Sequence, residues 1–251
     1  MQIFNGKTAL GASEKAAEIF AEVIKNKPDA VIGLATGSSP IGMYSALAKK
    51  CEAGEISFKN VKSVNLDEYV GLSADHDQSY AYFMAKNFFD LIDIDKKNTH
   101  LPCGTAADPK AECKAYDALI ASMGGIDIQV LGIGNNGHIA FNEPADNFSK
   151  GTQLIELTDS TIEANSRFFA SKSEVPTRAL SMGIGQIISA KKIVMIALGK
   201  GKAEILEKAL FGPVTPEVPA SILQFVGNVY VCGDEEALSV ILEKHPETVV
   251  G

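Results

Sequence analysis

Cysteine is scarce in this chain, and its four copies follow no pattern that binds a metal or builds a disulfide framework. No C-x-x-C pair occurs, and the spacing to the four histidines matches no metal site, so no metal ligand is predicted. Cys103 and Cys113 could in principle pair. Reduced thiols in a cytoplasmic protein are the favoured interpretation.

Long apolar runs and excess positive charge are missing as well. No stretch of about 18 apolar residues occurs and the N-terminus lacks the apolar core of a signal peptide, so neither a transmembrane helix nor a secretory signal is expected. The net charge is −8, which argues against non-specific binding to nucleic acid or to a membrane surface. An anionic substrate is not excluded, because backbone N–H groups and a few cations can hold a phosphate.

The 251 residues, 46% of them hydrophobic, suffice for a full core, and strand and helix patterns alternate along them. Strands are predicted at 30–35, 61–66, 126–131, 154–157, 192–198 and 229–232, helices at 13–25 (capped by Ser13), 43–48, 79–89, 111–123 and 203–210, and a mixed strand–turn–helix at 179–190. This alternation predicts a single α/β domain over residues 1–251, with a mostly parallel sheet and helices on both faces. The polar segment 148–176 is either a flap over the site or a surface excursion.

A glycine-rich loop at residues 132–144 directly follows one predicted strand, 126–131. It carries His138 and Glu143, and ligands of open α/β sheets bind at the carboxyl ends of the strands. An imidazole oriented by a carboxylate is a common acid/base arrangement, although this ring could simply hydrogen-bond its own loop. The letters also fit G-x-G-x-x-G, but no acidic residue ends a strand about 20 residues later, so a dinucleotide site is disfavoured.

Two further strand-to-helix turns have features of anion sites. Residues 36–40 offer backbone N–H groups and hydroxyls at a helix start, and residues 199–202 bring lysines to another. Each could instead be a plain turn, with capping serines or solvated lysines. Arg167 offers a planar fork suited to phosphate, or is a surface salt-bridge partner. No Walker A sequence is present, so nucleoside triphosphates are not favoured.

Two carboxylates, Asp67 and Glu68, end the predicted strand 61–66. A carboxylate at that place is a candidate general base, and it could equally cap the next segment. The pattern does not decide which of the two faces a cleft.

Taken together, these segments closely resemble the glucosamine-6-phosphate deaminase (glucosamine-6-phosphate isomerase) family. The matching pieces are collinear and span most of the chain: A-T-G-S-S-P (35–40), N-L-D-E-Y-V-G-L (65–72), G-I-G-N-N-G-H-I-A-F-N-E-P (132–144), N-S-R-F-F (165–169) and L-G-K-G-K-A (198–203). The resemblance implies a modified Rossmann-like sheet and conversion of D-glucosamine 6-phosphate and water to D-fructose 6-phosphate and ammonium in amino-sugar catabolism. It implies a sugar-phosphate substrate and no metal or organic cofactor.

The resemblance also implies residue roles. Asp67 matches the base that moves a proton between C2 and C1, His138 the group that opens the pyranose ring, and Glu143 the carboxylate that orients this histidine. The expected phosphate ligands are Gly37, Ser38, Ser39, Arg167 and Lys202.

Asn136 departs from the pattern, because many members carry Asp just before the Gly-His pair. Asn can hydrogen-bond but cannot carry negative charge, so Asn136 is expected to belong to the catalytic group and to shift the pH optimum.

A second departure concerns regulation. Members activated by N-acetylglucosamine 6-phosphate have a serine pair after Glu-Pro and basic residues on the next strand. In this chain the corresponding residues 145–148 include no serine pair, and residues 153–155 include no cation. We therefore expect no such activation, and a monomer or small homo-oligomer rather than a hexamer.

The two alternatives to a deaminase are a 6-phosphogluconolactonase and a sugar-phosphate sensor. The loop of 6-phosphogluconolactonases lacks F-N-E-P, so Glu143 and the D-E-Y segment favour the deaminase. A sugar-phosphate sensor is disfavoured for two reasons: the sequence shows no DNA-binding helix-turn-helix, and its net charge is negative.

Overall fold

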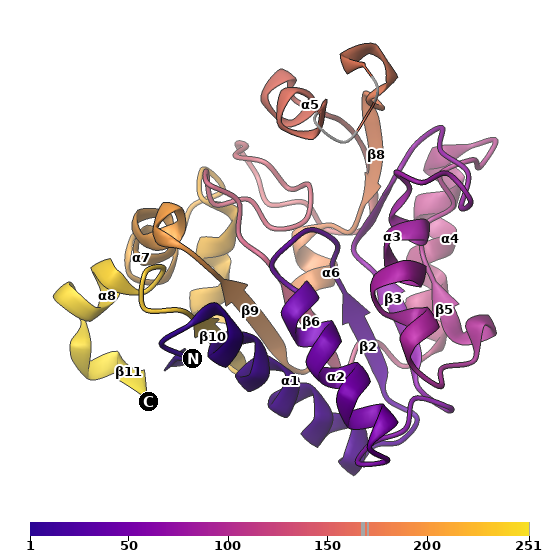
Figure 1. The fold of residues 1–251 in the computed structure, drawn as a ribbon. Helices are drawn as coiled ribbons and strands as arrows, with labels where there is room; N and C mark the ends of the chain where they lie inside the picture. Colours follow the sequence, from indigo (N-terminus) through magenta and orange to yellow (C-terminus); the bar gives the residue numbers. More distant parts are fainter. Residues whose placement is uncertain (167–168, 170, 251) are drawn as a thin grey trace.

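The computed structural model describes residues 1–166, 169 and 171–250. Within them, eight parallel strands form one central sheet in the order β11-β1-β10-β9-β6-β2-β3-β5 (Figure 1). The strands are β1 (Gln2–Asn5), β2 (Val31–Leu34), β3 (Lys62–Asn65), β5 (Thr99–His100), β6 (Ile128–Leu131), β9 (Ile193–Ala197), β10 (Val229–Gly233) and β11 (Val249–Val250). This confirms the predicted α/β fold.

Helices cover the sheet, and α1 and α2 lie side by side on the face toward the viewer in Figure 1. The α-helices are α1 (Ala9–Asn26), α2 (Ile41–Glu52), α3 (Tyr80–Asn87), α4 (Pro109–Ser122), α5 (Asp159–Ser166), α6 (Ile184–Ile188), α7 (Ala203–Phe211) and α8 (Ser239–Lys244). Short 3-10 helices are η1 (Phe89–Leu91), η2 (Lys96–Asn98), η3 (Lys172–Glu174), η4 (Lys200–Lys202), η5 (Pro219–Phe225) and η6 (Pro246–Thr248).

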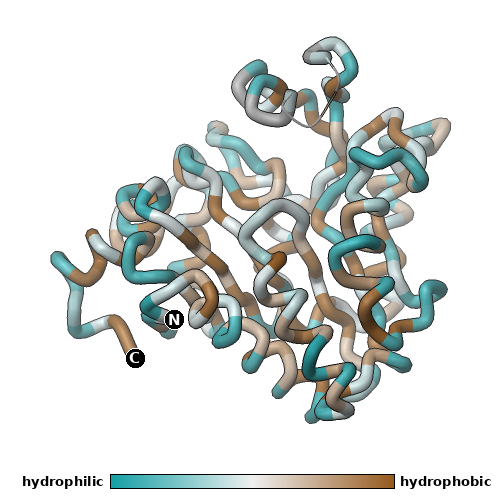
Figure 2. The backbone as a smooth tube through the Cα atoms, in the orientation of Figure 1, coloured by the Kyte–Doolittle hydropathy of each residue, from teal (hydrophilic) through white to brown (hydrophobic). Residues whose placement is uncertain are grey.

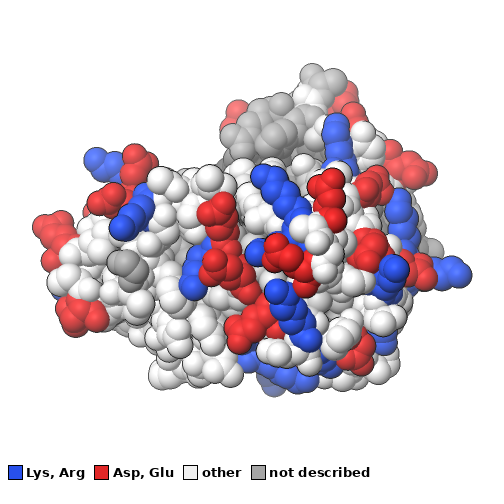
Figure 3. Space-filling model, turned by 60° about the horizontal axis from the view of Figure 1, so that its bottom comes forward, with Lys and Arg blue, Asp and Glu red and all other residues white. Residues whose placement is uncertain are grey.

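The central strands are apolar because helices bury both of their faces. Strands β2, β6 and β9 are buried along their whole length, which explains why they are apolar except for the buried Gln129 of β6. Figure 2 shows hydrophobic residues following these strands through the middle of the molecule. Figure 3 shows lysine, arginine, aspartate and glutamate interspersed on one face, with no continuous basic patch there, in keeping with the negative net charge.

The start of α1 differs from the prediction. The helix begins at Ala9 rather than Ser13, and Thr8 caps it by accepting a hydrogen bond from the Gly11 N–H at 3.1 Å. Ser13 is buried inside the helix and donates to the Ala9 carbonyl. The predicted start was wrong by one helical turn, because the apolar pattern from which it was taken becomes regular only after Ser13.

A second, three-stranded antiparallel sheet joins β4 (Asp67–Tyr69), β8 (Arg178–Ser181) and β7 (Gln153–Glu156) in that order. Only Leu66 separates β3 from β4, so one run of chain passes from the central sheet into the small one. Helix α5 belongs to the same excursion and stands above the end of the molecule to which the β2 and β9 arrows point (Figure 1). The small sheet thus connects the polar segment 148–176 to the carboxyl end of the central strands.

Candidate active site

A cleft of about 840 Å³ opens at the carboxyl ends of four neighbouring strands, β9, β6, β2 and β3. Strand β2 has β3 on one side and β6 on the other, so the chain changes direction along the sheet at this point. Such a switch point separates the loops that follow the two strands and leaves a crevice between them. The loops after β2, β3, β6 and β9 all contribute to the cleft lining.

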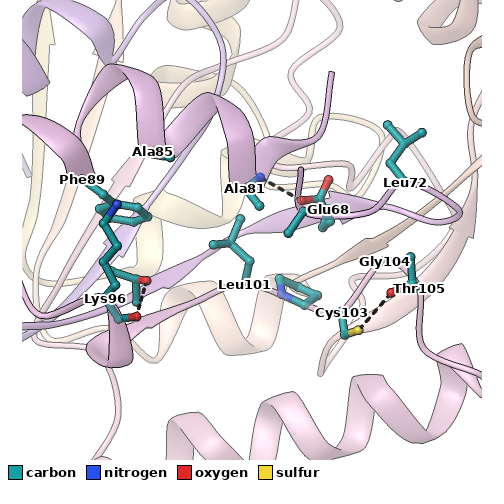
Figure 4. A pocket seen from close by; sticks show the side chains of 13 residues that line it. Glu68, Leu72, Ala81, Ala85, Phe89, Lys96, Leu101, Cys103, Gly104 and Thr105 are labelled. Carbon is teal, nitrogen blue, oxygen red and sulfur yellow. Dashed lines mark hydrogen bonds between the residues drawn. The ribbon is translucent and has the colours of Figure 1, made fainter. Parts of the chain in front are cut away.

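Asp67 and Glu68 turn to opposite sides of β4, as successive residues of a strand do. Asp67 lines the cleft, whereas Glu68 lines a separate pocket of about 340 Å³ behind it. Figure 4 shows Glu68 in that second pocket, bonded to the first turn of α3. The structure therefore settles the orientation that the sequence left open.

Burial raises the pKa of the Asp67 carboxyl to about 8, and the neighbouring Glu68 carboxylate adds to the shift. Asp67 is only 7% exposed, and no hydrogen bond to its side chain occurs within the described part of the chain. A carboxyl group of this kind can take up and release a proton near neutral pH, as a general base must.

Glu68 has a structural task. Its Oε1 accepts hydrogen bonds from the Tyr69 and Tyr80 N–H groups at 2.8 and 2.9 Å, and its Oε2 accepts one from Ala81 at 2.9 Å. It therefore ties β4 to the N-terminus of α3, where a carboxylate is favourable. Burial raises the pKa of Glu68, and these three backbone bonds oppose the rise.

His138, Asn136 and Glu143 form a hydrogen-bonded group that lines the same cleft. The Asn136 Nδ2 donates to Glu143 Oε2 at 2.6 Å, and the Asn136 Oδ1 lies 2.8 Å from His138 Nδ1. Glu143 Oε1 is 3.5 Å from the same ring nitrogen. Burial by itself would raise the pKa of Glu143, but hydrogen bonds from His138, Asn136 and Thr161 bring it below its usual value.

The amide fixes the tautomer of a neutral His138. An ionised Glu143 can only accept hydrogen bonds, so the Asn136 NH₂ must face it and the amide oxygen must face the ring. That oxygen is an acceptor, so His138 Nδ1 carries the proton and Nε2 keeps its lone pair. His138 is thus prepared to accept a proton on the nitrogen that the loop does not use.

Glycine at position 134 makes room for this ring. A Cβ there would come within 2.2 to 2.4 Å of three ring atoms of His138. Glycine also occurs at 137, where φ is +87°, and Ala140 has a left-handed φ of +52°. The backbone is strained at Ala140, between His138 and Glu143, as functional loops often are.

The predicted phosphate ligands lie at the cleft, apart from one. Gly37, with φ of +93°, and Ser38 and Ser39 follow β2 at the start of α2, and Lys202 follows β9. The Lys202 Nζ donates to Asn135 Oδ1 at 2.6 Å, and burial lowers the pKa of its ammonium group. These residues supply hydroxyls, backbone N–H groups and a cation. Arg167 lies outside the described residues.

The sequence assigned no role to several lining residues, although Tyr69, Phe141 and Phe169 lie in the motifs shared with the family. Tyr69, Tyr80 and Phe141 form an aromatic wall, with ring centroids of 4.7 Å for the two tyrosines and 6.1 Å for Tyr69 and Phe141. Phe169 and Thr161 reach the cleft from the flap segment. Tyr69 lies two residues after Asp67 and so shares its side of β4, but the small sheet was not predicted.

No group of three or more histidine, cysteine, aspartate or glutamate side chains that could hold a metal ion occurs in the described ranges. The same part of the chain has no helix long and apolar enough to cross a membrane.

Comparisons with known proteins agree with this geometry. Residues 6–231 match the model of the glucosamine-6-phosphate isomerase/6-phosphogluconolactonase family. A glucosamine-6-phosphate deaminase of Lachnoclostridium phytofermentans is 54% identical over 224 residues, which are 89% of this chain and 95% of that protein.

Solved structures give the same answer. One described as a monomeric glucosamine-6-phosphate deaminase is 44% identical, with a TM-score of 0.92 over 96% of this chain and all of the other. A 6-phosphogluconolactonase from Trypanosoma brucei, 16% identical with a TM-score of 0.73 over 95% of this chain and 97% of the other, shares the fold. The chain therefore belongs to the glucosamine-6-phosphate isomerase/6-phosphogluconolactonase family, and within it to the glucosamine-6-phosphate deaminases.

Proposed function

We propose that this protein converts D-glucosamine 6-phosphate and water to D-fructose 6-phosphate and ammonium. The observation that carries the proposal is that Asp67 and the His138–Asn136–Glu143 group line one and the same cleft. An isomerisation coupled to amine loss needs acid/base groups for both C–H and O–H protons, and these residues supply them.

The phosphate would be held at the end of the cleft formed by Gly37, Ser38, Ser39 and Lys202, with Arg167 as a further ligand. Backbone N–H groups and hydroxyls at the start of α2 complement the phosphate charge, and the Lys202 ammonium adds a cation. Anchoring this group would fix the sugar carbons in the cleft that Asp67 and His138 line.

His138 is proposed to open the ring. Its Nε2 lone pair takes the proton from the C1 hydroxyl of the pyranose and returns it to the ring oxygen as the C1–O5 bond breaks, which leaves an aldehyde at C1. Ionised Glu143 stabilises the imidazolium that forms between these two transfers. The Asn136 amide keeps the ring in the tautomer that allows the first transfer.

Asp67 is proposed to move the carbon-bound proton. Its carboxylate removes the C2 proton while the C1 aldehyde oxygen takes a proton from the C2 ammonium group, which gives a neutral enolamine. Asp67 then returns its proton to C1, so that the C2–N bond becomes an iminium. Water adds at C2, both of its protons pass to the nitrogen as the C2–N bond breaks and the C2 carbonyl forms, and the nitrogen leaves as ammonium. Since the pKa of Asp67 is about 8, the carboxyl group can act as base and then as acid near neutral pH.

We propose that the segment 148–176 acts as a lid of this single domain. Thr161 and Phe169 reach the cleft from it, and Phe169 packs edge-on against Tyr69 with a centroid distance of 6.2 Å. A cover over the cleft would exclude water while the enolamine exists.

We further propose a cytoplasmic monomer. The four cysteines are free thiols, which suits a reducing compartment, and the relative with the TM-score of 0.92 is described as monomeric. Light scattering behind size-exclusion chromatography tests the assembly: a mass near 26.6 kDa supports a monomer, and a sixfold mass contradicts it.

The reaction is tested by coupling ammonium release to a dehydrogenase assay, with glucosamine 6-phosphate as substrate. Wild type should release ammonium, and Asp67→Asn should lose about 100-fold or more in kcat. Lys97→Gln, an exposed change away from the cleft, serves as the control and should match wild type. Hydrolysis of 6-phosphogluconolactone without ammonium release would overturn the proposal.

A further inference from the structure

The flap segment contributes a hydroxyl to the catalytic wall. On α5, the Thr161 Oγ1 donates a hydrogen bond to Glu143 Oε1 at 3.2 Å. This is the carboxylate oxygen that lies 3.5 Å from His138 Nδ1, whereas the other oxygen accepts from Asn136. Each Glu143 oxygen therefore has its own donor, and one of the donors comes from outside the loop that carries the histidine.

The proton of the Thr161 hydroxyl has a defined direction. The Thr158 Oγ1 donates to Thr161 Oγ1 at 3.0 Å, so the single proton of Thr161 is left for Glu143. Thr158 also accepts from the Thr161 backbone N–H at 3.2 Å, which fixes the first turn of α5. Ile162, the next residue, packs into the apolar cluster of Tyr69, Leu157 and Ala179 and anchors the helix.

We propose that Thr161 is a positioning residue of the deaminase reaction, whose hydroxyl holds Glu143 Oε1 where the carboxylate orients His138 and stabilises its imidazolium form. The inference rests on the proposed function and adds to it a residue on the flap. Its chemical basis is that a donor to a carboxylate favours the ionised form, and the ionised form is the one that can pair with an imidazolium.

Among the described residues His138 is the cation paired with Glu143, so the Glu143 carboxylate is positioned by Thr161 and by the loop that carries the histidine. Asp67, Asp77 and Lys202 line the same cleft, and the Lys202 ammonium donates to Asn135 rather than to Glu143. On α5 itself, Asp159 and Glu163 are exposed.

The test compares Thr161→Val, which keeps the branched shape and removes the hydroxyl, with Thr161→Ser, which restores the donor. For Thr161→Val we expect kcat to fall about tenfold with KM within about twofold of wild type. The inflection of the kcat–pH profile that follows Glu143, on the acidic side of that of Asp67, should move to higher pH, because losing a donor raises the pKa of Glu143. Thr161→Ser should recover most of the rate and the wild-type profile.

The matched control is Thr177→Val, an exposed threonine just before β8. It should leave kcat and the pH profile as in wild type. A second readout does not depend on turnover: ¹³C NMR of glutamate carboxyls should show Glu143 titrating at higher pH in folded Thr161→Val than in wild type.

The outcomes separate this inference from the proposed function. If wild type releases no ammonium, the proposed function is wrong. If wild type is active while Thr161→Val matches it in kcat and pH profile, the role of Thr161 is wrong. A lower kcat with an unchanged profile, no NMR shift and no recovery in Thr161→Ser would mean a packing role, and would equally overturn the inference.

Discussion

At the scale of single residues, Asp67 combines a catalytic position with a cost in stability. Its pKa is about 8 in the folded protein because of burial and the adjacent Glu68, against an ordinary value of 3.8. Between these two values the folded state holds a proton that the unfolded chain has lost. The free energy of unfolding therefore falls as pH rises from about 4 to about 8, by up to about 1.4 kcal/mol per pH unit from this group.

Asp67→Asn should remove this dependence. The variant should gain on wild type as the pH rises from 5 to 8, since the amide pays no penalty for ionisation. Urea unfolding of both proteins at pH 5, 6.5 and 8 measures the difference. A gap that stays constant over this range would contradict the raised pKa.

Asn136 is the second residue that controls protonation. Its Nδ2 lies 2.6 Å from Glu143 Oε2, so Asn136→Asp would place two carboxylates against each other. They would then share one proton, and the pKa of one of them would rise strongly. We expect a pH–rate profile with a displaced acidic limb, measured from pH 5 to 9. A profile identical to that of wild type would show that the charge at position 136 is unimportant.

How far the sequence predicts the site also differs between residues. His138 and Glu143 were found because their loop is short, glycine-rich and follows a buried strand, so local pattern and position in the fold agree. Asp67 and Glu68 could not be separated, because their roles depend on which side of β4 faces the cleft. Thr161 was missed because its hydroxyl meets Glu143 only through the return of the flap, 18 residues further along the chain.

At the scale of elements, the N-terminus of α3 is the contact that holds β4 in place. Glu68 accepts three backbone hydrogen bonds there, two of them from α3. In Glu68→Gln one oxygen is replaced by an NH₂ group that faces these donors. We expect a loss of about 1–2 kcal/mol in the free energy of unfolding, measured by urea titration. We also expect a reduced kcat, because Asp67 shares the strand.

The control is the corresponding contact on α4, where Asp108 accepts from the Lys110 and Ala111 N–H groups. Asp108→Ala should cost about 1 kcal/mol in unfolding free energy with kcat unchanged. If Glu68→Gln loses stability and keeps its full kcat, the contact holds α3 without positioning Asp67.

The long elements could be predicted and the short ones could not. Strands β2, β6 and β9 can be recognised in the sequence as largely apolar runs, because both of their faces are buried. Strands β5 and β11 have two residues each, too few for any period to show. Strand β4 carries the polar pair Asp67 and Glu68, and its pairing with β8 depends on residues more than 100 positions away.

At the scale of the whole molecule, another buried carboxylate, Asp127, lies at the amino ends of the central strands. Asp127, just before β6, accepts from Lys191 at 2.8 Å, from Lys27 at 2.7 Å and from the Val31 N–H at 2.8 Å. Burial alone would raise the pKa of Asp127, but these donors hold it below its usual value. This carboxylate therefore stabilises the fold above about pH 4, and the contribution is lost as the pH falls further.

Asp67 and Asp127 should together give the protein a maximum in unfolding free energy at intermediate pH. Asp127 determines the decrease below this maximum, toward acidic pH. Asp127→Asn should be less stable than wild type at pH 7, and the gap should narrow at pH 3. Urea unfolding at both values measures it. An equally wide gap at pH 3 would mean that Asp127 acts through packing alone.

The fit between Gly134 and the His138 ring also bears on how such a loop can change over generations. A Cβ at position 134 would overlap the imidazole, so His138 keeps this orientation only beside a glycine four residues earlier. With any other residue at 134 the ring has to take a different position. A library that varies both positions independently will retain His138 in this orientation only beside Gly134, and the pair behaves as one heritable unit.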